Sequence, residues 1–356
     1  MREKSRILLT PESKREFENL CRLSGQIGSD PLQVQGAGGN TSIKIDDTLW
    51  IKASGTWLQN AETEKLFVPV ALTPLLQSID DKDSAAEKST DFVLSELNPD
   101  NLRPSIETTV HAVIPQRVVV HSHCVDTIAV AVQENAEQIL TDILKGYCWL
   151  WVPYFRPGLP LSRYIGQHRQ TDTDVVILGN HGLVIAADTI AEAENLMQSV
   201  RSAIVQIVRS QNQVDPKSLS DFCNGTGYLP ANDAIAHSIA FDSVSINIAA
   251  SGSLYPDHVI FLGDGTAVAG ENESLKDAVN RITADTGSAP ISLVIPDKGV
   301  LMKADANPGQ HAMARCIADV TARLHETASV RYLNELNVYE LLNWEAEHYR
   351  QKLNTK

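Results

Sequence analysis

Two apolar segments that carry histidines at defined places constrain the fold of this chain most. Residues 117–124 read RVVVHSHC, and residues 174–187 read DVVILGNHGLVIAA. Both segments are rich in β-branched residues, which favour strands. The first predicts one strand, and the second predicts two strands joined by a tight turn at Gly179–Gly182. Segments with helical patterns flank them, so we expect a mixed α/β fold.

The rest of the chain divides into two α/β units at a turn-rich segment, residues 221–233. Before it we expect helices over residues 13–28, 103–115, 126–146 and 189–209, and a β-hairpin formed by Ser42–Ile45 and Thr48–Ala53. After it we expect a strand over 258–262, a helix over 274–286, a strand pair within 291–304, and helices over 308–326 and 338–352. The prediction is therefore a domain over residues 1–220 and a smaller α/β domain over residues 221–356.

Length and charge limit the classes of protein that are possible. A chain of 356 residues suggests about two domains. The net charge of −14 argues against a general nucleic-acid binder and against a protein held by charge on anionic lipid. No apolar run approaches the roughly 18 residues that a membrane span needs. Five dispersed cysteines without a C-x-x-C pair fit reduced thiols, so we expect a cytoplasmic protein.

Three histidines form the strongest candidate for a metal site. His121 and His123 are two positions apart on the predicted strand, so their side chains point to the same face. His181 lies in the Gly-Asn-His-Gly turn and projects from the edge of the sheet. Three imidazoles in this arrangement suggest an open zinc site. One alternative is that one of His121 and His123 is a core residue and the other is solvated. The other alternative is that His181 is an ordinary exposed turn histidine.

A carboxylate and two glycine-containing turns complete the candidate site. Glu107, which precedes the strand of His121, is a candidate general base or metal ligand, although a glutamate at a helix start is usually a favourable dipole charge. Glycines in the loop Gly36–Asn40 let backbone N–H groups converge on an anion. The segment IKASGTW also combines a glycine, Gly55, with polar side chains, Lys52 and Ser54. Ser105, two positions before Glu107, adds a further hydroxyl. Together these features predict a phosphate site. The alternative is that each is a tight turn without a ligand, which is the usual case for one such turn alone. The predicted phosphate-site residues are Gly39, Asn40, Thr41, Lys52, Ser54, Gly55 and Ser105.

Six motifs occur in one order along about 200 residues: GGNTS, KASGTW, PSIE, HSH, VPY and GNHGLV. In these the sequence resembles the class II aldolase/adducin family. Its continuation is similar to the aldolase portion of bifunctional rhamnulose-1-phosphate aldolase/dehydrogenase proteins, without their dehydrogenase part. The resemblance implies a class II aldolase-type α/β/α sandwich with a central, mainly antiparallel sheet, followed by a smaller C-terminal α/β domain.

The resemblance also implies roles for individual residues. His121, His123 and His181 would bind zinc, and Glu107 would be the acid/base and a ligand of the resting metal. Tyr154, in VPY, matches a tyrosine that donates a proton across a subunit interface. The phosphate contacts would come from Asn40, Thr41, Ser54, Gly55 and Ser105. One departure is Ile106, which stands where fuculose-phosphate-type aldolases have a second serine, and it leaves the substrate open.

The implied activity is zinc-dependent cleavage of a ketose 1-phosphate, such as rhamnulose 1-phosphate, to dihydroxyacetone phosphate and an aldehyde. Two alternatives remain open. The same metal site would serve an epimerase, decarboxylase or dehydratase of a sugar phosphate or sugar acid, and an adducin-like interaction protein would keep the fold without catalysis. The resemblance further implies a homotetramer, and a separate dehydrogenase is a possible partner. We expect no nucleic-acid or membrane partner.

Overall fold

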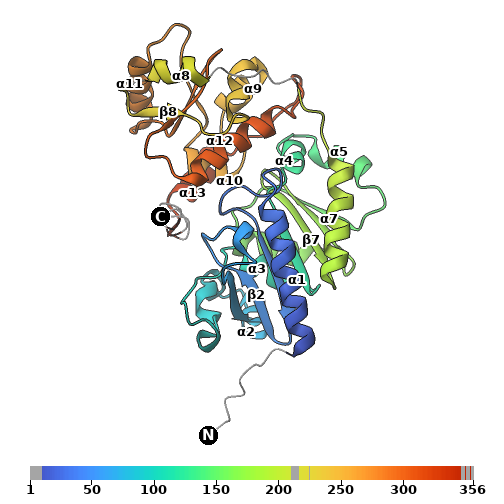
Figure 1. Cartoon of the computed structure of the whole chain (residues 1–356). Coiled ribbons are helices and arrows are strands. Elements are labelled where there is room, and N and C mark those ends of the chain that lie inside the picture. The colour runs from blue at the N-terminus through green and yellow to red at the C-terminus, as the bar shows by residue number, and fades with distance from the viewer. Residues whose placement is uncertain (1–9, 210–215, 224, 346–348, 350–352, 354–356) are drawn as a thin grey trace.

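Two β-sheets form the framework of the protein (Figure 1). The structure is a computed structural model that describes residues 10–209, 216–223, 225–345, 349 and 353. The N-terminal half contains a seven-stranded sheet of order β3-β2-β1-β4-β7-β6-β5, in which only the β5–β6 pair is parallel. The predicted mainly antiparallel sheet is thus confirmed. Its strands are β1 (Asn40–Ile45), β2 (Thr48–Lys52), β3 (Phe67–Ala71), β4 (Val118–Ser122), β5 (Trp149–Val152), β6 (Val175–Leu178) and β7 (Gly182–Ala187).

Helices cover both faces of this sheet because its strands are apolar on both sides. Val118 and Val120 of β4 belong to the apolar cluster that includes residues of α1 and α7, whereas Val119 belongs to the cluster that includes residues of α3 and α6. The result is a sandwich of helices, sheet and helices. One face carries α1 (Pro11–Gly28), α4 (Val125–Ala131), α5 (Ala136–Ile143) and α7 (Ile190–Ile204); the other carries α2 (Leu72–Asp80), α3 (Thr108–Val113) and α6 (Leu159–His168).

Several helix boundaries differ from those predicted. The first helix begins at Pro11 because the Thr10 side chain accepts a hydrogen bond from the backbone N–H of Ser13 and caps it. The single helix expected over 126–146 is two helices, α4 and α5. The helix before the boundary segment is capped by Thr189 and Glu192, as predicted, but ends at Ile204 rather than near residue 209.

The C-terminal half is built on a four-stranded sheet of order β8-β11-β10-β9. The expected strand over 258–262 is wrong, because these residues belong to a helix. Pro256 stands at its first position, where proline favours a helix start, and a short buried apolar run cannot be told from a strand by periodicity alone. The elements are α8 (Pro216–Cys223), β8 (Tyr228–Pro230), α9 (Ser243–Ala250), α10 (Pro256–Leu262), β9 (Ala267–Val268), α11 (Leu275–Thr286), β10 (Ser292–Ile295), β11 (Gly299–Lys303), α12 (Pro308–Thr321) and α13 (Glu335–Leu342). Part of the helix expected over 338–352 lies outside the described residues.

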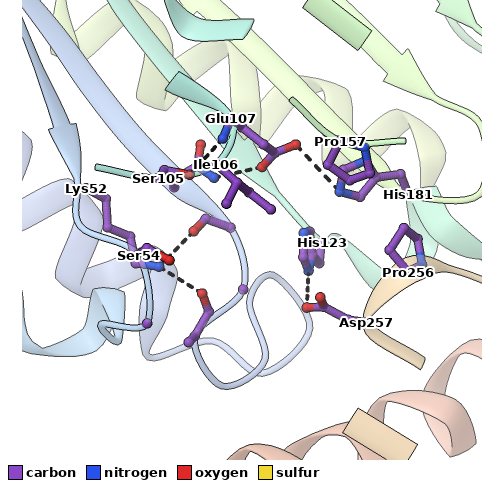
Figure 2. Close-up of a pocket in the computed structure, with 15 residues that line it drawn as sticks. Lys52, Ser54, Ser105, Ile106, Glu107, His123, Pro157, His181, Pro256 and Asp257 are labelled. Atoms are coloured by element: carbon purple, nitrogen blue, oxygen red, sulfur yellow. Dashed lines mark hydrogen bonds and ion pairs between the residues drawn. The ribbon is translucent and has the colours of Figure 1, made fainter. Parts of the chain in front are cut away.

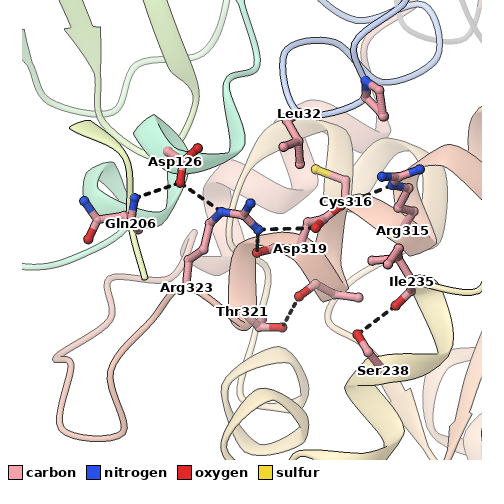
Figure 3. Close-up of polar contacts among 12 residues, drawn as sticks. Leu32, Asp126, Gln206, Ile235, Ser238, Arg315, Cys316, Asp319, Thr321 and Arg323 are labelled. Atoms are coloured by element: carbon pink, nitrogen blue, oxygen red, sulfur yellow. Dashed lines mark hydrogen bonds and ion pairs between the residues drawn. The ribbon is translucent and has the colours of Figure 1, made fainter. Parts of the chain in front are cut away.

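Helix α4 joins the two halves. Val125 and Ile128 pack in one apolar cluster with Phe261 of α10 and Ile317 of α12. Beside this cluster the Arg323 guanidinium lies 2.9 Å from a carboxylate oxygen of Asp126, which also accepts a hydrogen bond from the backbone N–H of residue 206 (Figure 3). Other residues of α4 belong to the core beneath the large sheet. In space, therefore, α4 belongs to the cores of both halves. None of the described helices is both long and apolar enough to cross a membrane.

The burial of α4 gives a prediction for stability. Ile128 is fully buried, so Ile128→Ala leaves a cavity between the halves and should lower the free energy of unfolding by about 2–5 kcal/mol. Ile207 is 91% exposed, and Ile207→Ala should change it by less than about 0.5 kcal/mol. Thermal and urea unfolding of both variants measure the difference. Equal effects would contradict the placement of α4 in a shared core.

Candidate metal and phosphate site

Three histidines meet at one edge of the large sheet. His121 is on β4, His123 follows the end of β4, and His181 is in the turn between β6 and β7. Strands β4 and β7 are paired, with His121 opposite Val184, so the turn lies beside the end of β4. The ring centroids are 4.9–5.3 Å apart, and one ring nitrogen of each histidine lies within 4.8 Å of the others. The predicted convergence of the three imidazoles is confirmed.

Glu107 faces two of these histidines. It stands just before α3, and its side chain does not cap the helix. One carboxylate oxygen, Oε2, lies 3.3 Å from His121 Nε2 and accepts a hydrogen bond of 2.8 Å from Asn40 Nδ2. The other, Oε1, lies 3.7 Å from His181 Nε2 (Figure 2). The helix-dipole alternative therefore does not account for where the carboxylate points.

The register of β1 explains this cluster. Directly paired residues of antiparallel strands share a face of the sheet, and Asn40 is paired with His121. On the same face Ser42 Oγ lies 2.7 Å from the Nδ1 atom of buried His111, so this nitrogen takes part in a hydrogen bond. The sheet thus orients Asn40 toward the carboxylate of Glu107.

The donor atoms of the cluster fit a divalent metal ion. The Nδ1 atom of His121 lies 3.1 Å from the carbonyl oxygen of Leu183, which makes Nδ1 the donor and leaves a lone pair on Nε2. His121 Nε2 and Glu107 Oε1 are buried and have no hydrogen-bond partner among the described residues. A lone pair that faces a carboxylate inside a protein is unfavourable without a cation between them. The residues present therefore fit a bound cation.

Burial sets the protonation states that metal binding requires. It lowers the pKa of His181 to about 3 and lowers the pKa of His121 below its ordinary value, so both imidazoles are neutral near pH 7. Burial by itself would raise the pKa of Glu107. Attraction to the protonated forms of the adjacent His121 and His181, together with the hydrogen bond from Asn40, opposes this and lowers that pKa to about 2. Neutral imidazoles and an ionised carboxylate are the forms that bind metal.

A glycine-rich pocket adjoins the histidines. Gly39 has φ of 56°, and a Cβ atom there would lie 2.9 Å from the carbonyl oxygen of His121, so both its conformation and its surroundings require glycine. Lys52 Nζ donates hydrogen bonds of 2.8 and 3.0 Å to the carbonyl oxygens of Ala37 and Gly39, which places a buried positive charge against the loop. Nine of the predicted residues line this pocket: Gly39, Asn40, Lys52, Ser54, Gly55, Ser105, Glu107, His123 and His181.

Two predicted site residues lie elsewhere in the structure. Thr41 points to the opposite face of β1, as alternation requires, and its hydroxyl lies 2.7 Å from the hydroxyl of Ser24 on α1. Tyr154 does not line the pocket of its own chain; it packs against the apolar cluster of the C-terminal half, and its hydroxyl is buried without a hydrogen-bond partner among the described residues. Burial raises the pKa of Tyr154 well above its ordinary value.

Three lining residues lie outside the loop Gly36–Asn40 and outside the six motifs. Pro157 follows the VPY motif, whereas Pro256 and Asp257 come from α10 in the C-terminal half (Figure 2). Asp257 Oδ2 lies 3.2 Å from His123 Nδ1. No spacing pattern in the sequence connects these residues to the histidines, because the contact depends on how the two halves pack.

Residues 18–207 match the family described as Class II Aldolase and Adducin N-terminal domain. The match spans more than half of the chain, which therefore belongs to the class II aldolase/adducin family. A curated relative, "Uncharacterized oxidoreductase YuxG" of Bacillus subtilis (strain 168), is 32% identical over 184 residues. That alignment covers 48% of this chain and 26% of the relative, so the chain matches about a quarter of the relative's length.

Solved structures of other proteins also resemble part of this chain. The N-terminal class II aldolase domain of a conserved protein from Thermoplasma acidophilum is 25% identical, with a TM-score of 0.47, and the match covers 57% of this chain and 97% of that one. An L-fuculose-1-phosphate aldolase from Thermus thermophilus is 17% identical, with a TM-score of 0.35 and coverages of 52% and 92%.

The cluster predicts bound metal. Protein purified without chelator should contain one divalent metal ion per chain, measured by inductively coupled plasma mass spectrometry. His181→Ala removes one ligand and should lower that content by about tenfold or more after dialysis, because the loss of one ligand opens the coordination sphere. His168→Ala, which changes an exposed histidine of α6, should retain the metal. Equal metal content in the two variants would contradict the site.

Proposed function

We propose that the protein is a zinc-dependent aldolase that cleaves a ketose 1-phosphate, such as rhamnulose 1-phosphate, to dihydroxyacetone phosphate and an aldehyde. One observation carries this proposal. Glu107, His123 and His181, which belong to the histidine cluster, line the same pocket as the glycine-rich loop and Lys52. A single small molecule with a phosphate and a carbonyl group would therefore contact both sets of residues. Membership of the class II aldolase/adducin family supports the same reaction class.

Each part of the pocket has a task in this reaction. Zinc held by three neutral histidines would supply the positive charge that stabilises negative charge developing on the substrate oxygens. Glu107 is ionised and lies beside these histidines, so it accepts or returns a proton at the carbon next to the carbonyl. Asn40 fixes the carboxylate through its hydrogen bond. Backbone N–H groups of the glycine-rich loop and the hydroxyls of Ser54 and Ser105 bind the phosphate.

The same residues would serve related reactions that create negative charge next to a carbonyl. Epimerisation, decarboxylation and dehydration also pass through such negative charge. A non-catalytic adducin-like protein would not need side chains that stabilise it. The four buried metal-site side chains favour catalysis over the last alternative, because burial of such groups costs stability. Product analysis separates the rest: an aldehyde identifies an aldolase, carbon dioxide a decarboxylase, an isomer an epimerase, and a product that has lost water a dehydratase.

We also propose a homotetramer in the cytoplasm, with a separate dehydrogenase as a partner. Strand β5 supports self-association, because it is the edge of the large sheet and its side chains at Trp149, Leu150 and Trp151 are only half-buried. In such an assembly Tyr154 would be the proton donor to a neighbouring pocket. Since its hydroxyl is buried within its own chain, the role requires a movement of that side chain.

Glu107→Gln tests the proton-transfer step. The amide keeps the shape and loses the base, so turnover of the ketose 1-phosphate should fall by about 10²–10⁴-fold. Metal content should change much less than turnover. The control Glu137→Gln, at an exposed position of α5, should leave both unchanged. Undiminished turnover in Glu107→Gln would remove this residue from the mechanism.

Light scattering and subunit mixing test the assembly. The solution mass should be four times the 38.9 kDa of one chain. If Tyr154 serves a neighbouring pocket, mixtures of Tyr154→Phe and Glu107→Gln subunits contain some pockets with both residues intact, and activity should partly return. A fully active monomer, or no recovery after subunit exchange, would contradict the shared pocket.

A further inference from the structure

The C-terminal half reaches the metal site through one carboxylate. Asp257 is 3% exposed and stands at the second position of α10, directly after Pro256. Its Oδ2 atom lies 3.2 Å from Nδ1 of His123, which is 6% exposed (Figure 2). A buried carboxylate of one half thus contacts a candidate metal ligand of the other half.

This contact orients the imidazole of His123. A neutral imidazole has one donor and one acceptor nitrogen, and a carboxylate near Nδ1 makes Nδ1 the donor. The lone pair is then on Nε2, which is the ring nitrogen available to a metal. Carboxylate partners of this kind typically contribute about 10–100-fold to metal affinity.

The ring of His123 is in contact with both halves of the chain. The glycine-rich loop approaches so closely that a Cβ atom on Gly38 would lie 2.7 Å from Nδ1. The same nitrogen faces Asp257 of α10. The chain that follows His123 enters α4, whose residues Val125 and Ile128 are buried in the core of the C-terminal half. The position of this ligand therefore depends on the packing of the two halves.

We infer that Asp257 is a positioning residue for His123, so that the C-terminal half completes the metal site and metal binding is coupled to the packing of the two halves. The inference rests on the metal site of the proposed function, but not on the substrate or the reaction. A second explanation is that Asp257 only joins the halves, as Asp126 does through Arg323. Metal affinity separates the two explanations, because substitution of a positioning residue lowers it, whereas substitution of a residue that only joins the halves does not.

The experiment compares the same substitution at two buried carboxylates. Zinc affinity is measured by competition with a chromogenic chelator in the full-length wild type, Asp257→Asn and Asp126→Asn. We expect Asp257→Asn to bind zinc about 10–100-fold more weakly than the wild type. We expect Asp126→Asn to remain within about threefold of the wild type, because its oxygens face Arg323 and the backbone of residue 206. An Asp257→Asn affinity within threefold of the wild type, or equal losses in both variants, would overturn the inference.

Thermal unfolding gives a second readout. A ligand that binds only the folded state raises its stability in proportion to the logarithm of its affinity. Saturating zinc should therefore raise the thermal midpoint of Asp257→Asn less than that of the wild type or of Asp126→Asn. An equal rise in all three proteins would count against the coupling.

A measurement on the wild type keeps the inference testable if Asp257→Asn fails to fold. Solid-state NMR of zinc-loaded protein labelled with ¹⁵N-histidine reports which ring nitrogen carries the proton. We expect the His123 ring to carry it on Nδ1, and a proton on Nε2 would overturn the assignment. A wild type that binds no zinc would overturn this inference together with the proposed function. If the wild type binds zinc and the His123 results agree with the inference, but the protein cleaves no ketose phosphate, only the proposed function is overturned.

Discussion

The site depends on the antiparallel pairing of β4 between β1 and β7. This pairing places Asn40 and Val184 on either side of His121, and it brings the β6–β7 turn with His181 to the end of the strand that carries His123. A shift of one residue in either register would turn these side chains to the opposite face. The apolar residues on both faces of β4 fix the register, because each face is buried under helices. Core packing thereby determines the geometry of the histidine cluster.

Burial gives this cluster its chemical character. Glu107 lies close to two histidines, and its carboxylate is held as an anion although it is almost completely buried. His121 and His181 are neutral because burial opposes their protonation. Such an arrangement costs folding stability unless a cation compensates it. The same residues therefore explain why the pocket would bind metal tightly and why a proton-accepting group stands beside it.

Much of this site could be predicted from the sequence, because it rests on short-range rules. Two-residue periodicity predicted that His121 and His123 share a face, and a glycine-flanked turn between two apolar strands predicted the place of His181. The same rule of alternation, applied to Asn40 and Thr41, would have shown that Thr41 faces α1. The contribution of Asp257 could not be predicted, since it depends on the packing of two halves that are distant in sequence. The sequence predicts a strand over 258–262 in place of its helix, because periodicity does not distinguish a short buried apolar run from a strand.

The central claim is that the three histidines bind one divalent metal ion next to a phosphate pocket. Anomalous X-ray diffraction at the zinc absorption edge, from crystals grown with zinc, tests it most directly. The account predicts one strong anomalous peak per chain, with nitrogen atoms of His121, His123 and His181 about 2.0–2.3 Å from its centre. Crystals whose diffraction shows no peak among these histidines, or a peak bound only by other residues, would contradict it.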